Sequence, residues 1–378
     1  MKQKLSVLFI CGWYPSRVSP FNGDFIERHA KAVAKKHLVD VIHIISDKNQ
    51  KNNIEITAEK GRNLNTQIAY LKSSKNLFLK TFLYLKAFFI LLKKIEKIDI
   101  IHLNELYPFG IYCLYLKWFK KKQFIISEHW TGYHEPQSKN ISVFQKLISK
   151  IICKNAAFVC PVSNNLTKSI EHIGLKGTFK RVPNIVETDL FYPIEKPTST
   201  YTITHVSNML DTHKNVTGFL NVIKQLENEI EHFKVNLIGE NSQKYKKHAL
   251  KLGIKPSIIH FQDQIPYKEV AKVLQNSNLF VLFSNYENLP CVILESFSCG
   301  IPVISTNVGG ISEFFPEDFG KLIPKKNEQK LKKEIINFYN KKHFVAAKNK
   351  MHDYVKANFS EDTVADDFTS LYLKAIKV

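Results

Sequence analysis

The sequence predicts an α/β protein with two doubly wound domains, each a parallel β-sheet covered by helices on both faces. Short apolar runs rich in β-branched residues alternate with helical stretches along most of the 378 residues. Continuous apolar strands of this kind are typical of parallel sheets buried on both faces. The alternation lapses over residues 181–200, where proline and threonine accumulate. We therefore expect two Rossmann-like domains, joined by a linker and facing one another across a cleft.

The apolar runs place the individual elements. In the N-terminal half we expect strands at residues 4–10, 39–46, 98–104 and 123–129, with a helix at 25–37 after the first strand. In the C-terminal half we expect strands at 201–207, 234–239, 258–262, 279–284 and 302–306, each leading into a helix, the last near 311–315. The resulting domains are 1–185 and 186–360. Residues 361–378 are predicted to form a terminal amphipathic helix that packs back on the N-terminal domain.

The charge of the chain is strongly positive and comes almost entirely from lysine. The net charge is +20, and only four of the 54 basic residues are arginines. Base-reading and phosphate-clamping surfaces use the arginine fork, so the composition argues against a specific nucleic-acid reader. A lysine-rich protein is attracted to an anionic membrane surface. The alternative is a biased overall composition with no functional meaning.

Residues 75–97 form an apolar stretch interrupted by lysines. On a helical projection Lys75, Lys86, Lys93 and Lys97 fall within an arc of about 40°. The apolar run is too short to span a bilayer, so one interpretation is a helix lying in the membrane interface with its lysines towards lipid head groups. The alternative is a core helix whose lysines form its solvent face. Lys120–Lys122, beside aromatic residues, add to the basic character of this half.

The six cysteines form no Cys-x-x-Cys pair and no metal-ligand cluster. They lie in or beside apolar runs, which is typical of buried free thiols in a reducing compartment. The apolar run at the N-terminus is short and favours a first strand over a signal peptide. We therefore expect a cytoplasmic protein without a metal site.

The stretch "SNYENLPCVILESFSCGIPVISTNVGG", residues 284–310, contains two glutamates at an informative spacing. Glu287 is expected in the loop at the carboxyl end of a parallel strand, where doubly wound sheets bind ligands. Glu295 is expected inside the following helix, which begins near Pro290 and ends at Gly300. The first helical amides favour a phosphate at the same place. Two carboxylates beside a phosphate need hydroxyl donors, which predicts a sugar nucleotide with its sugar at Glu287 and its ribose at Glu295.

Glu287 and Glu295, with "CGIPVISTNVGGISEF" behind them, resemble the Glu-x7-Glu signature of the retaining GT-B glycosyltransferases of family 4 (glycosyl transferases group 1). The resemblance extends along the chain. "NGDFIERHAKAVAKKH" is similar to the N-terminal glycine loop and helix of that family, and "SEHWTGY" to its histidine motif. "VPNIVETDLFYP" is similar to its linker, and "HVSNMLDTHKN" occupies the place of its "VGRL…KG" segment.

The resemblance implies a GT-B fold and transfer of a sugar from a UDP-, GDP- or ADP-sugar with retention of configuration, without a metal or other cofactor. It implies that Glu287 holds the donor sugar, that Lys214 stabilises the leaving diphosphate, and that His129 lies near the sugar across the cleft. The backbone at Gly23 would approach the diphosphate from the other domain. The remaining donor-binding candidates are Asn208, Asn288, Leu289, Pro290, Cys291 and Val292, and further cleft candidates are Glu128, Tyr133 and Asn184.

The expected acceptor is a saccharide or lipid-linked saccharide in cell-surface polysaccharide biosynthesis, with the protein peripheral on the inner face of the cell membrane. Asn208 stands where the family usually has arginine, so one cation for the diphosphate is missing. Two other functions remain open. One is a GT-B epimerase or phosphorylase; the other is a non-catalytic scaffold that binds a membrane or a polyanion.

Overall fold

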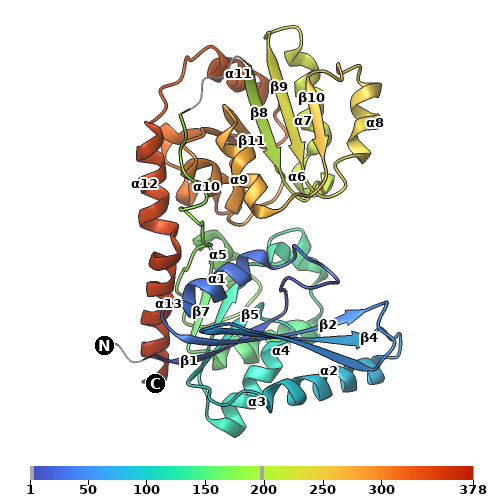
Figure 1. Ribbon diagram of the computed structural model, residues 1–378, viewed down its shortest axis with the longest axis vertical. Helices are drawn as coiled ribbons and strands as arrows, with labels where there is room; N and C mark the ends of the chain where they lie inside the picture. Colours follow the sequence, from blue (N-terminus) through green and yellow to red (C-terminus); the bar gives the residue numbers. More distant parts are fainter. Residues whose placement is uncertain (1–3, 196–199, 378) are drawn as a thin grey trace. The chain divides into compact units, whose positions relative to one another are not determined.

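The computed structural model describes residues 4–195 and 200–377 and divides the chain into two compact units (Figure 1). The first unit contains residues 1–185 together with 361–378, and the second contains residues 186–360. The chain therefore leaves the first unit after Ile185 and returns to it at Glu361. Each unit contains one β-sheet of its own.

The first unit has a seven-stranded sheet in the order β3-β4-β2-β1-β5-β6-β7. All neighbouring strands are parallel except β3 and β4, which form an antiparallel hairpin at one edge. The strands are β1 (Ser6–Cys11), β2 (Leu38–Asp47), β3 (Ile54–Lys60), β4 (Leu64–Lys72), β5 (Ile100–Asn104), β6 (Phe124–Glu128) and β7 (Phe158–Pro161). The helices are α1 (Asp24–Ala34), α2 (Leu77–Leu92), α3 (Gly110–Lys120), α4 (Val143–Asn155), α5 (Asn164–His172) and α13 (Glu361–Ile376), with 3₁₀ turns at Thr131–Tyr133 and Gln137–Asn140.

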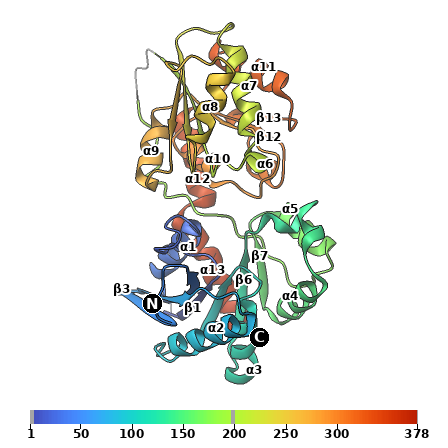
Figure 2. The same cartoon turned by 90° about the vertical axis from the view of Figure 1, so that its right-hand side faces the viewer.

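Helices cover both faces of this sheet. Successive side chains of β1 point to opposite faces, so Val7, Phe9 and Cys11 join one core with the side chains of α1 and α13. In α13, the Tyr372 hydroxyl lies 2.6 Å from Nδ1 of His102 on β5, and both side chains are fully buried. Helices α2, α3 and α4 lie together on the other side of the sheet (Figures 1 and 2). The last helix of the chain is thus part of the core of the first unit.

The second unit has a six-stranded parallel sheet in the order β10-β9-β8-β11-β12-β13. Its strands are β8 (Tyr201–Val206), β9 (Phe233–Ile238), β10 (Ile259–Gln262), β11 (Leu279–Leu282), β12 (Val303–Thr306) and β13 (Gly320–Ile323). Its helices are α6 (Asp211–Lys214), α7 (Val216–Leu226), α8 (Lys244–Lys251), α9 (Tyr267–Gln275), α10 (Cys291–Ser298), α11 (Glu328–Tyr339) and α12 (Lys348–Phe359), with 3₁₀ turns at Ile311–Phe314 and Glu317–Phe319. Buried aliphatic and aromatic side chains of α7, β9 and β11 form much of its core.

The predicted fold class, two doubly wound α/β domains, is confirmed by these sheets. Four strands were not predicted from the sequence: the β3–β4 hairpin, β7 and β13. Strand β3 is an edge strand with a largely exposed and polar sequence, and β7 and β13 are only four residues long. The helix expected at 25–37 is α1, which ends earlier, at Ala34, and the helix expected at 311–315 is only a 3₁₀ turn.

The helix expected over residues 75–97 was also predicted too long. Helix α2 begins after Asn76, whose side chain accepts a hydrogen bond from the Leu79 amide at 3.1 Å, and it ends at Leu92. Lys75, Lys93 and Lys97 therefore lie outside the helix, and Lys97 forms an ion pair with Asp99 at 3.2 Å. The four lysines do not form one continuous helical face.

Candidate active site

The strand order of the second sheet reverses between β8 and β11. Strand β9 lies on one side of β8 and β11 on the other, so the connections that leave these two strands run in opposite directions. In open parallel sheets the crevice at such a point, outside the carboxyl ends of the strands, is where ligands bind. Lys214 ends the short helix α6 that follows β8, and Glu287 lies in the loop that follows β11. Both candidates therefore lie at the switch point of this sheet.

The structure brings Glu287 and Lys214 into direct contact. The Lys214 ammonium forms an ion pair with Oε1 of Glu287, and the Ser284 hydroxyl donates to the same oxygen at 2.7 Å. The side chains of Glu287 and Lys214 are only 8% and 15% exposed. Among the described residues, no hydrogen bond or ion pair reaches Oε2 of Glu287. This carboxylate is fixed through one oxygen and keeps the other for a hydroxyl donor.

Backbone contacts fix the loop that carries Glu287. The Asn285 amide donates to the His213 carbonyl at 2.7 Å, which ties this loop to helix α6. Gly309 lies against the Glu287 carbonyl with φ +60°, and a Cβ there would come within 1.8 Å of that oxygen. The Gly310 amide donates to the Asn288 carbonyl at 2.9 Å. Only glycine fits at position 309, because any side chain would displace the loop that positions Glu287.

Helix α10 begins at the same edge of the sheet. Pro290 is its N-cap residue, in an extended conformation and without a side-chain cap, and Cys291 is the first helical residue. Asn288 and Leu289 are buried in the turn before the helix, whereas Pro290, Cys291 and Val292 are partly exposed. A helix N-terminus carries a partial positive charge and favours an anion. The five predicted donor-binding residues at 288–292 thus form one turn and the start of one helix.

Glu295 lies one turn further along α10 and is 2% exposed. Its Oε1 accepts a hydrogen bond from the Tyr267 hydroxyl of α9 at 2.8 Å, and the Tyr267 ring packs against Phe191 at 4.9 Å. Sequence reasoning missed Tyr267, because it lies 28 residues before Glu295 in a different helix. The remaining candidate in this unit, Asn208, is exposed, and its side chain accepts a hydrogen bond from the Leu210 amide at 3.2 Å.

The candidates of the first unit follow β1 and β6. Gly23 is the N-cap of α1 with φ +77°, and a Cβ there would lie 2.6 Å from backbone atoms of Trp13 and Tyr14. Its carbonyl accepts the first hydrogen bonds of the helix, from Ile26 and Glu27. The close approach of the loop therefore requires glycine at position 23.

The His129 side chain points into the first unit. Both ring nitrogens are buried, the ring packs 4.7 Å from Phe25 and 5.5 Å from His29, and the Asn184 side chain lies beside it. Burial lowers the pKa of His129 to about 3, although the neighbouring Asn184 side chain opposes that shift. The imidazole is therefore neutral at physiological pH, and its role towards a sugar stays a prediction.

Glu128 is fully buried and holds two loops together. Its Oε1 accepts from the amides of His129 and Trp130 at 2.9 Å, while its Oε2 accepts from the Leu106 amide at 3.0 Å and the Tyr133 hydroxyl at 3.2 Å. Burial raises the pKa of Glu128, and these hydrogen bonds oppose the shift. The structure thus pairs two predicted cleft residues, Glu128 and Tyr133, with each other inside the unit.

Glu105 is a carboxylic acid at the same edge that sequence reasoning missed. It follows β5, next to Gly12 at the end of β1, and has φ +76°, which is uncommon for a residue other than glycine. Burial, and to a smaller extent the nearby Glu128 carboxylate, raise the pKa of Glu105 to about 8. Among the described residues, its side chain has no hydrogen-bond or ion-pair partner. A glutamate directly after the predicted strand at 98–104 was the available signal.

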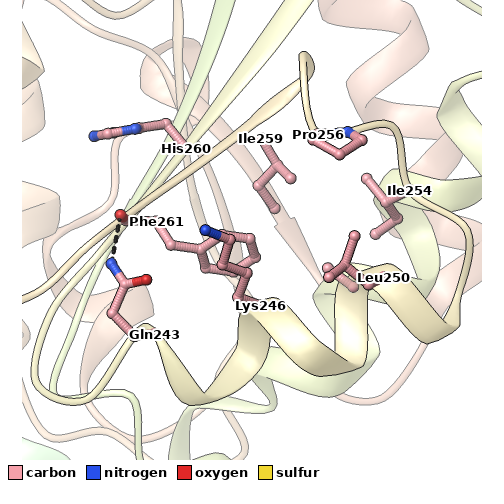
Figure 3. A pocket seen from close by; sticks show the side chains of 9 residues that line it. Gln243, Lys246, Leu250, Ile254, Pro256, Ile259, His260 and Phe261 are labelled. Carbon is pink, nitrogen blue, oxygen red and sulfur yellow. Dashed lines mark hydrogen bonds between the residues drawn. The ribbon is translucent and has the colours of Figure 1, made fainter.

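Two pockets lie away from these residues. In the second unit, a cavity of about 340 Å³ lies between α8 and the edge strand β10, lined by apolar side chains such as Leu250, Ile254 and Ile259 (Figure 3). In the first unit, a polar cavity of about 780 Å³ at the end of β2 is lined by Arg17, Asp47 and several Asn, Gln and Lys side chains. No predicted site residue lines either cavity. Within residues 4–195 and 200–377, no group of His, Cys, Asp or Glu side chains is arranged to hold a metal ion.

Comparison with known proteins identifies the family. The model described as Glycosyltransferase Family 4 matches residues 23–190, and the model described as Glycosyl transferases group 1 matches residues 188–358. Among curated proteins, a segment of 79 residues is 40% identical to the Vi polysaccharide biosynthesis protein VipC/TviE of Salmonella typhi, covering 21% of this chain and 13% of that protein. A segment of 164 residues is 26% identical to the lipopolysaccharide 1,6-galactosyltransferase of Escherichia coli, covering 42% of this chain and 45% of that protein. The chain thus spans less than half the length of either relative.

Solved structures resemble the whole chain. A sucrose-phosphate synthase from Thermosynechococcus elongatus has a TM-score of 0.80 at 19% identity, over 98% of this chain and 99% of that chain. The Anabaena protein HepE in complex with UDP and glucose has a TM-score of 0.72 at 14% identity, over 97% of this chain and 98% of that chain. At these identities the likeness shows the fold, and the two family models together span residues 23–358. The chain therefore belongs to the GT-B glycosyltransferases of family 4.

Proposed function

We propose that this protein transfers a sugar from a nucleoside diphosphate sugar to a saccharide or lipid-linked saccharide in cell-surface polysaccharide biosynthesis. The observation that carries the proposal is the Lys214–Glu287–Ser284 cluster at the switch point of the second sheet, next to the N-terminus of α10. It combines one cation, one half-satisfied carboxylate and a helix N-terminus. A diphosphate bound to a sugar needs these three elements.

The donor would bind with its diphosphate at Lys214 and the α10 amides. The bond between the anomeric carbon and the diphosphate breaks during transfer, so negative charge accumulates on the leaving phosphate oxygen. Hydrogen-bond donors that are already fixed near such a charge lower the activation barrier, because the site does not need to reorganise during the reaction. Glu287 would accept hydrogen bonds from the sugar hydroxyls through Oε2, while its Oε1 keeps the Lys214 ammonium in place. Glu295 would accept hydrogen bonds from the ribose hydroxyls, with Tyr267 orienting it.

We further propose that transfer retains the anomeric configuration and needs no metal. Attack on the same face as the leaving group lets the departing phosphate oxygen take the proton of the acceptor hydroxyl. In that arrangement Lys214 and the helix N-terminus, rather than a divalent cation, neutralise the diphosphate. The anomer of the product, read by NMR, and a rate unchanged by EDTA are the expected results.

The first unit would bind the acceptor. The carboxyl edge of its sheet offers Glu105 as a hydrogen-bonding group, and the polar cavity at Arg17 adds amide and carboxylate groups. Neutral polyhydroxyl compounds suit such a surface. The relative named as a Vi polysaccharide biosynthesis protein supports an acceptor of this class. We propose a cytoplasmic location, peripheral on the inner face of the cell membrane, where a lipid-linked acceptor is available.

The deciding experiment is titration of the purified protein with UDP, GDP and ADP by calorimetry, followed by an assay of sugar-nucleotide hydrolysis with the nucleotide that binds. We expect one nucleotide to bind, and its sugar donors to be hydrolysed slowly when no acceptor is present. If no nucleotide binds and no donor is hydrolysed, the proposal is wrong and a non-catalytic scaffold is favoured. If a nucleotide sugar is consumed without transfer or hydrolysis and an isomeric sugar appears, the protein is an epimerase.

A further inference from the structure

Three neighbouring helices of the first unit carry most of the exposed apolar side chains of the protein. Of the 22 large apolar side chains that are exposed in the described residues, 13 lie on α2, α3 and α4. The remaining nine are scattered over the rest of the described chain. Soluble proteins expose single apolar residues freely, but a concentration of them on one surface indicates an interaction site.

Helix α2 is apolar on two opposite faces. Its buried residues, among them Leu83, Ala87 and Leu91, face the sheet. Phe78, Phe82, Leu85 and Phe89 follow the spacing i, i+4, i+7 and i+11, which places them in one stripe about 180° from the buried residues. Their exposed fractions range from 39% to 89%. The stripe is about 16 Å long, from the rise of an α-helix.

Aromatic contacts continue the stripe from α2 onto α3. The Phe89 ring lies 5.2 Å from the Tyr115 ring, which lies 5.3 Å from the Phe119 ring. Phe119 is 71% exposed and Trp118 is 50% exposed. We call this continuous region the α2–α3 surface; it consists of Leu77, Phe78, Leu79, Phe82, Leu85, Phe89, Ile111, Trp118 and Phe119. Helix α4, which contacts α3 through Asn155, exposes a further four apolar side chains.

The charges on these three helices all have one sign. Helices α2, α3 and α4 contain seven lysines and no aspartate or glutamate. Lys75, Lys86 and Lys93 are exposed beside the α2 stripe, and Lys120 and Lys121 are exposed at the end of α3. The occupant of the surface must therefore be apolar in its interior and anionic at its boundary.

We propose that the α2–α3 surface inserts into the interface of an anionic lipid bilayer, with Phe and Trp rings among the acyl chains and lysines at the head groups. Aromatic and aliphatic residues flanked by lysines are the composition that lies in a membrane interface. A second copy of this chain is a poor occupant, because the two lysine-rich surfaces would repel each other. None of the helices that the structure describes is long and apolar enough to span a bilayer. The inference deepens the proposed function, because it names the surface that would bring the protein to a lipid-linked acceptor.

Vesicle binding by the full chain tests this inference without any donor or acceptor. We expect binding to vesicles of phosphatidylcholine mixed with phosphatidylglycerol, and weaker binding to phosphatidylcholine alone. The triple variant Phe78→Ser, Phe82→Ser, Phe89→Ser should bind at least about 10-fold more weakly, since it removes three inserted rings. The matched control is Leu250→Ser with Phe344→Ser, which removes exposed apolar side chains from the second unit. It should bind as the unmodified protein does.

Two further readouts separate insertion from simple charge attraction. Insertion predicts that part of the binding persists at about 0.5 M salt, because screening does not weaken apolar contacts. It also predicts a blue shift of tryptophan fluorescence on vesicle binding, which Trp118→Phe abolishes without abolishing binding.

No binding to either vesicle, equal loss in the triple variant and its control, or complete release by salt would overturn the inference. A dimer in solution that the triple variant makes monomeric would also overturn it, in favour of a second copy. Nucleotide binding by calorimetry is independent of all these outcomes, so failure here is distinguishable from failure of the proposed function.

Discussion

The carboxyl edges of the two sheets both carry glutamates, but in opposite electrostatic environments. In the second unit Glu287 meets the ammonium group of Lys214 and a serine hydroxyl. In the first unit Glu128 is surrounded by uncharged N–H and O–H donors, and Glu105 has no partner among the described residues. Burial raises the pKa of both Glu105 and Glu128. The same residue type is therefore held as an ion pair in one unit and is shifted towards its neutral form in the other.

This difference supports the proposed binding of the donor by the second unit and of the acceptor by the first. A diphosphate carries charge that must be compensated, and the largely buried Lys214 together with the N-terminus of α10 can supply that compensation. A neutral saccharide needs hydrogen-bonding groups and no fixed cation. We therefore expect substitutions in the second unit to act on donor affinity and turnover. Substitutions in the first unit should act on folding stability while leaving nucleotide binding unchanged.

The largest effect is expected for Lys214→Met. It removes the cation that compensates the leaving diphosphate and leaves Glu287 buried without its partner. Turnover should fall about 10²- to 10³-fold, as for the loss of one transition-state donor. The measurement is a steady-state rate with the donor found by calorimetry, with melting curves to verify folding. Lys255→Met, an exposed lysine of the same unit, is the control. An unchanged rate would show that Lys214 does not take part in the transfer reaction.

The next effect is expected for Glu295→Ala, compared with Glu287→Ala. Glu295 would contact the ribose equally in the ground and transition states, so its loss should raise the donor KM about 10- to 150-fold with turnover little changed. Glu287 would contact the transferred sugar, so its loss should chiefly lower turnover. Tyr267→Phe, which removes only the hydroxyl on Glu295, should give a weaker version of the Glu295 effect. Unchanged donor affinity in a folded Glu295→Ala variant would show that the ribose binds elsewhere.

In the first unit, Glu128→Gln should lower the free energy of unfolding by about 2 kcal/mol, since an amide cannot accept all four hydrogen bonds. Urea unfolding measures this loss. Nucleotide affinity by calorimetry should stay within error of the unmodified protein. A Glu128→Gln variant that keeps its free energy of unfolding but loses nucleotide affinity would contradict the assignment of nucleotide binding to the second unit.

The effect expected for Glu105→Gln depends on pH and vanishes at low pH. The folded pKa of Glu105 is about 8 against an ordinary 4.5, so the folded state binds more protons between these values. Stability contributed by the neutral form is complete below about pH 4.5 and is lost as pH rises through 8. The variant avoids this loss, so it should be more stable than the unmodified protein by about 1–3 kcal/mol at pH 8.5 and equal to it at pH 4.5. Melting curves at both values test this, with Glu59→Gln on the exposed edge strand as control.

Local sequence pattern was sufficient to predict nine of the thirteen strands that the structure describes and the positions of Glu287 and Glu295. Apolar β-branched runs identify parallel strands, and Pro290 and Gly300 mark the ends of α10. The contact between Lys214 and Glu287 was not predictable from pattern, because the two residues are 73 positions apart. They meet only because β8 and β11 are neighbours in the sheet.

The direction of a side chain was the second feature that could not be predicted from the sequence. Glu128 and His129 are adjacent in sequence and follow a predicted strand, so both were expected at the ligand site. The structure turns both side chains into the unit, towards amides and Asn184 respectively. Helix α2 shows the same limit, because a helix that is apolar all round gives no signal of which stripe faces the sheet.

Helix α13 has a consequence for biosynthesis. Its Phe368 and Tyr372 side chains complete the core against Phe9 and His102, which belong to strands near the start of the chain. On the ribosome the core of the first unit cannot be completed until the 175 residues of 186–360 have been made, about 9–35 s at ordinary elongation rates. During that interval the second unit can fold, while the nascent first unit presents an apolar face to chaperones. We therefore expect the second unit to complete its core before the first unit, although its synthesis begins later.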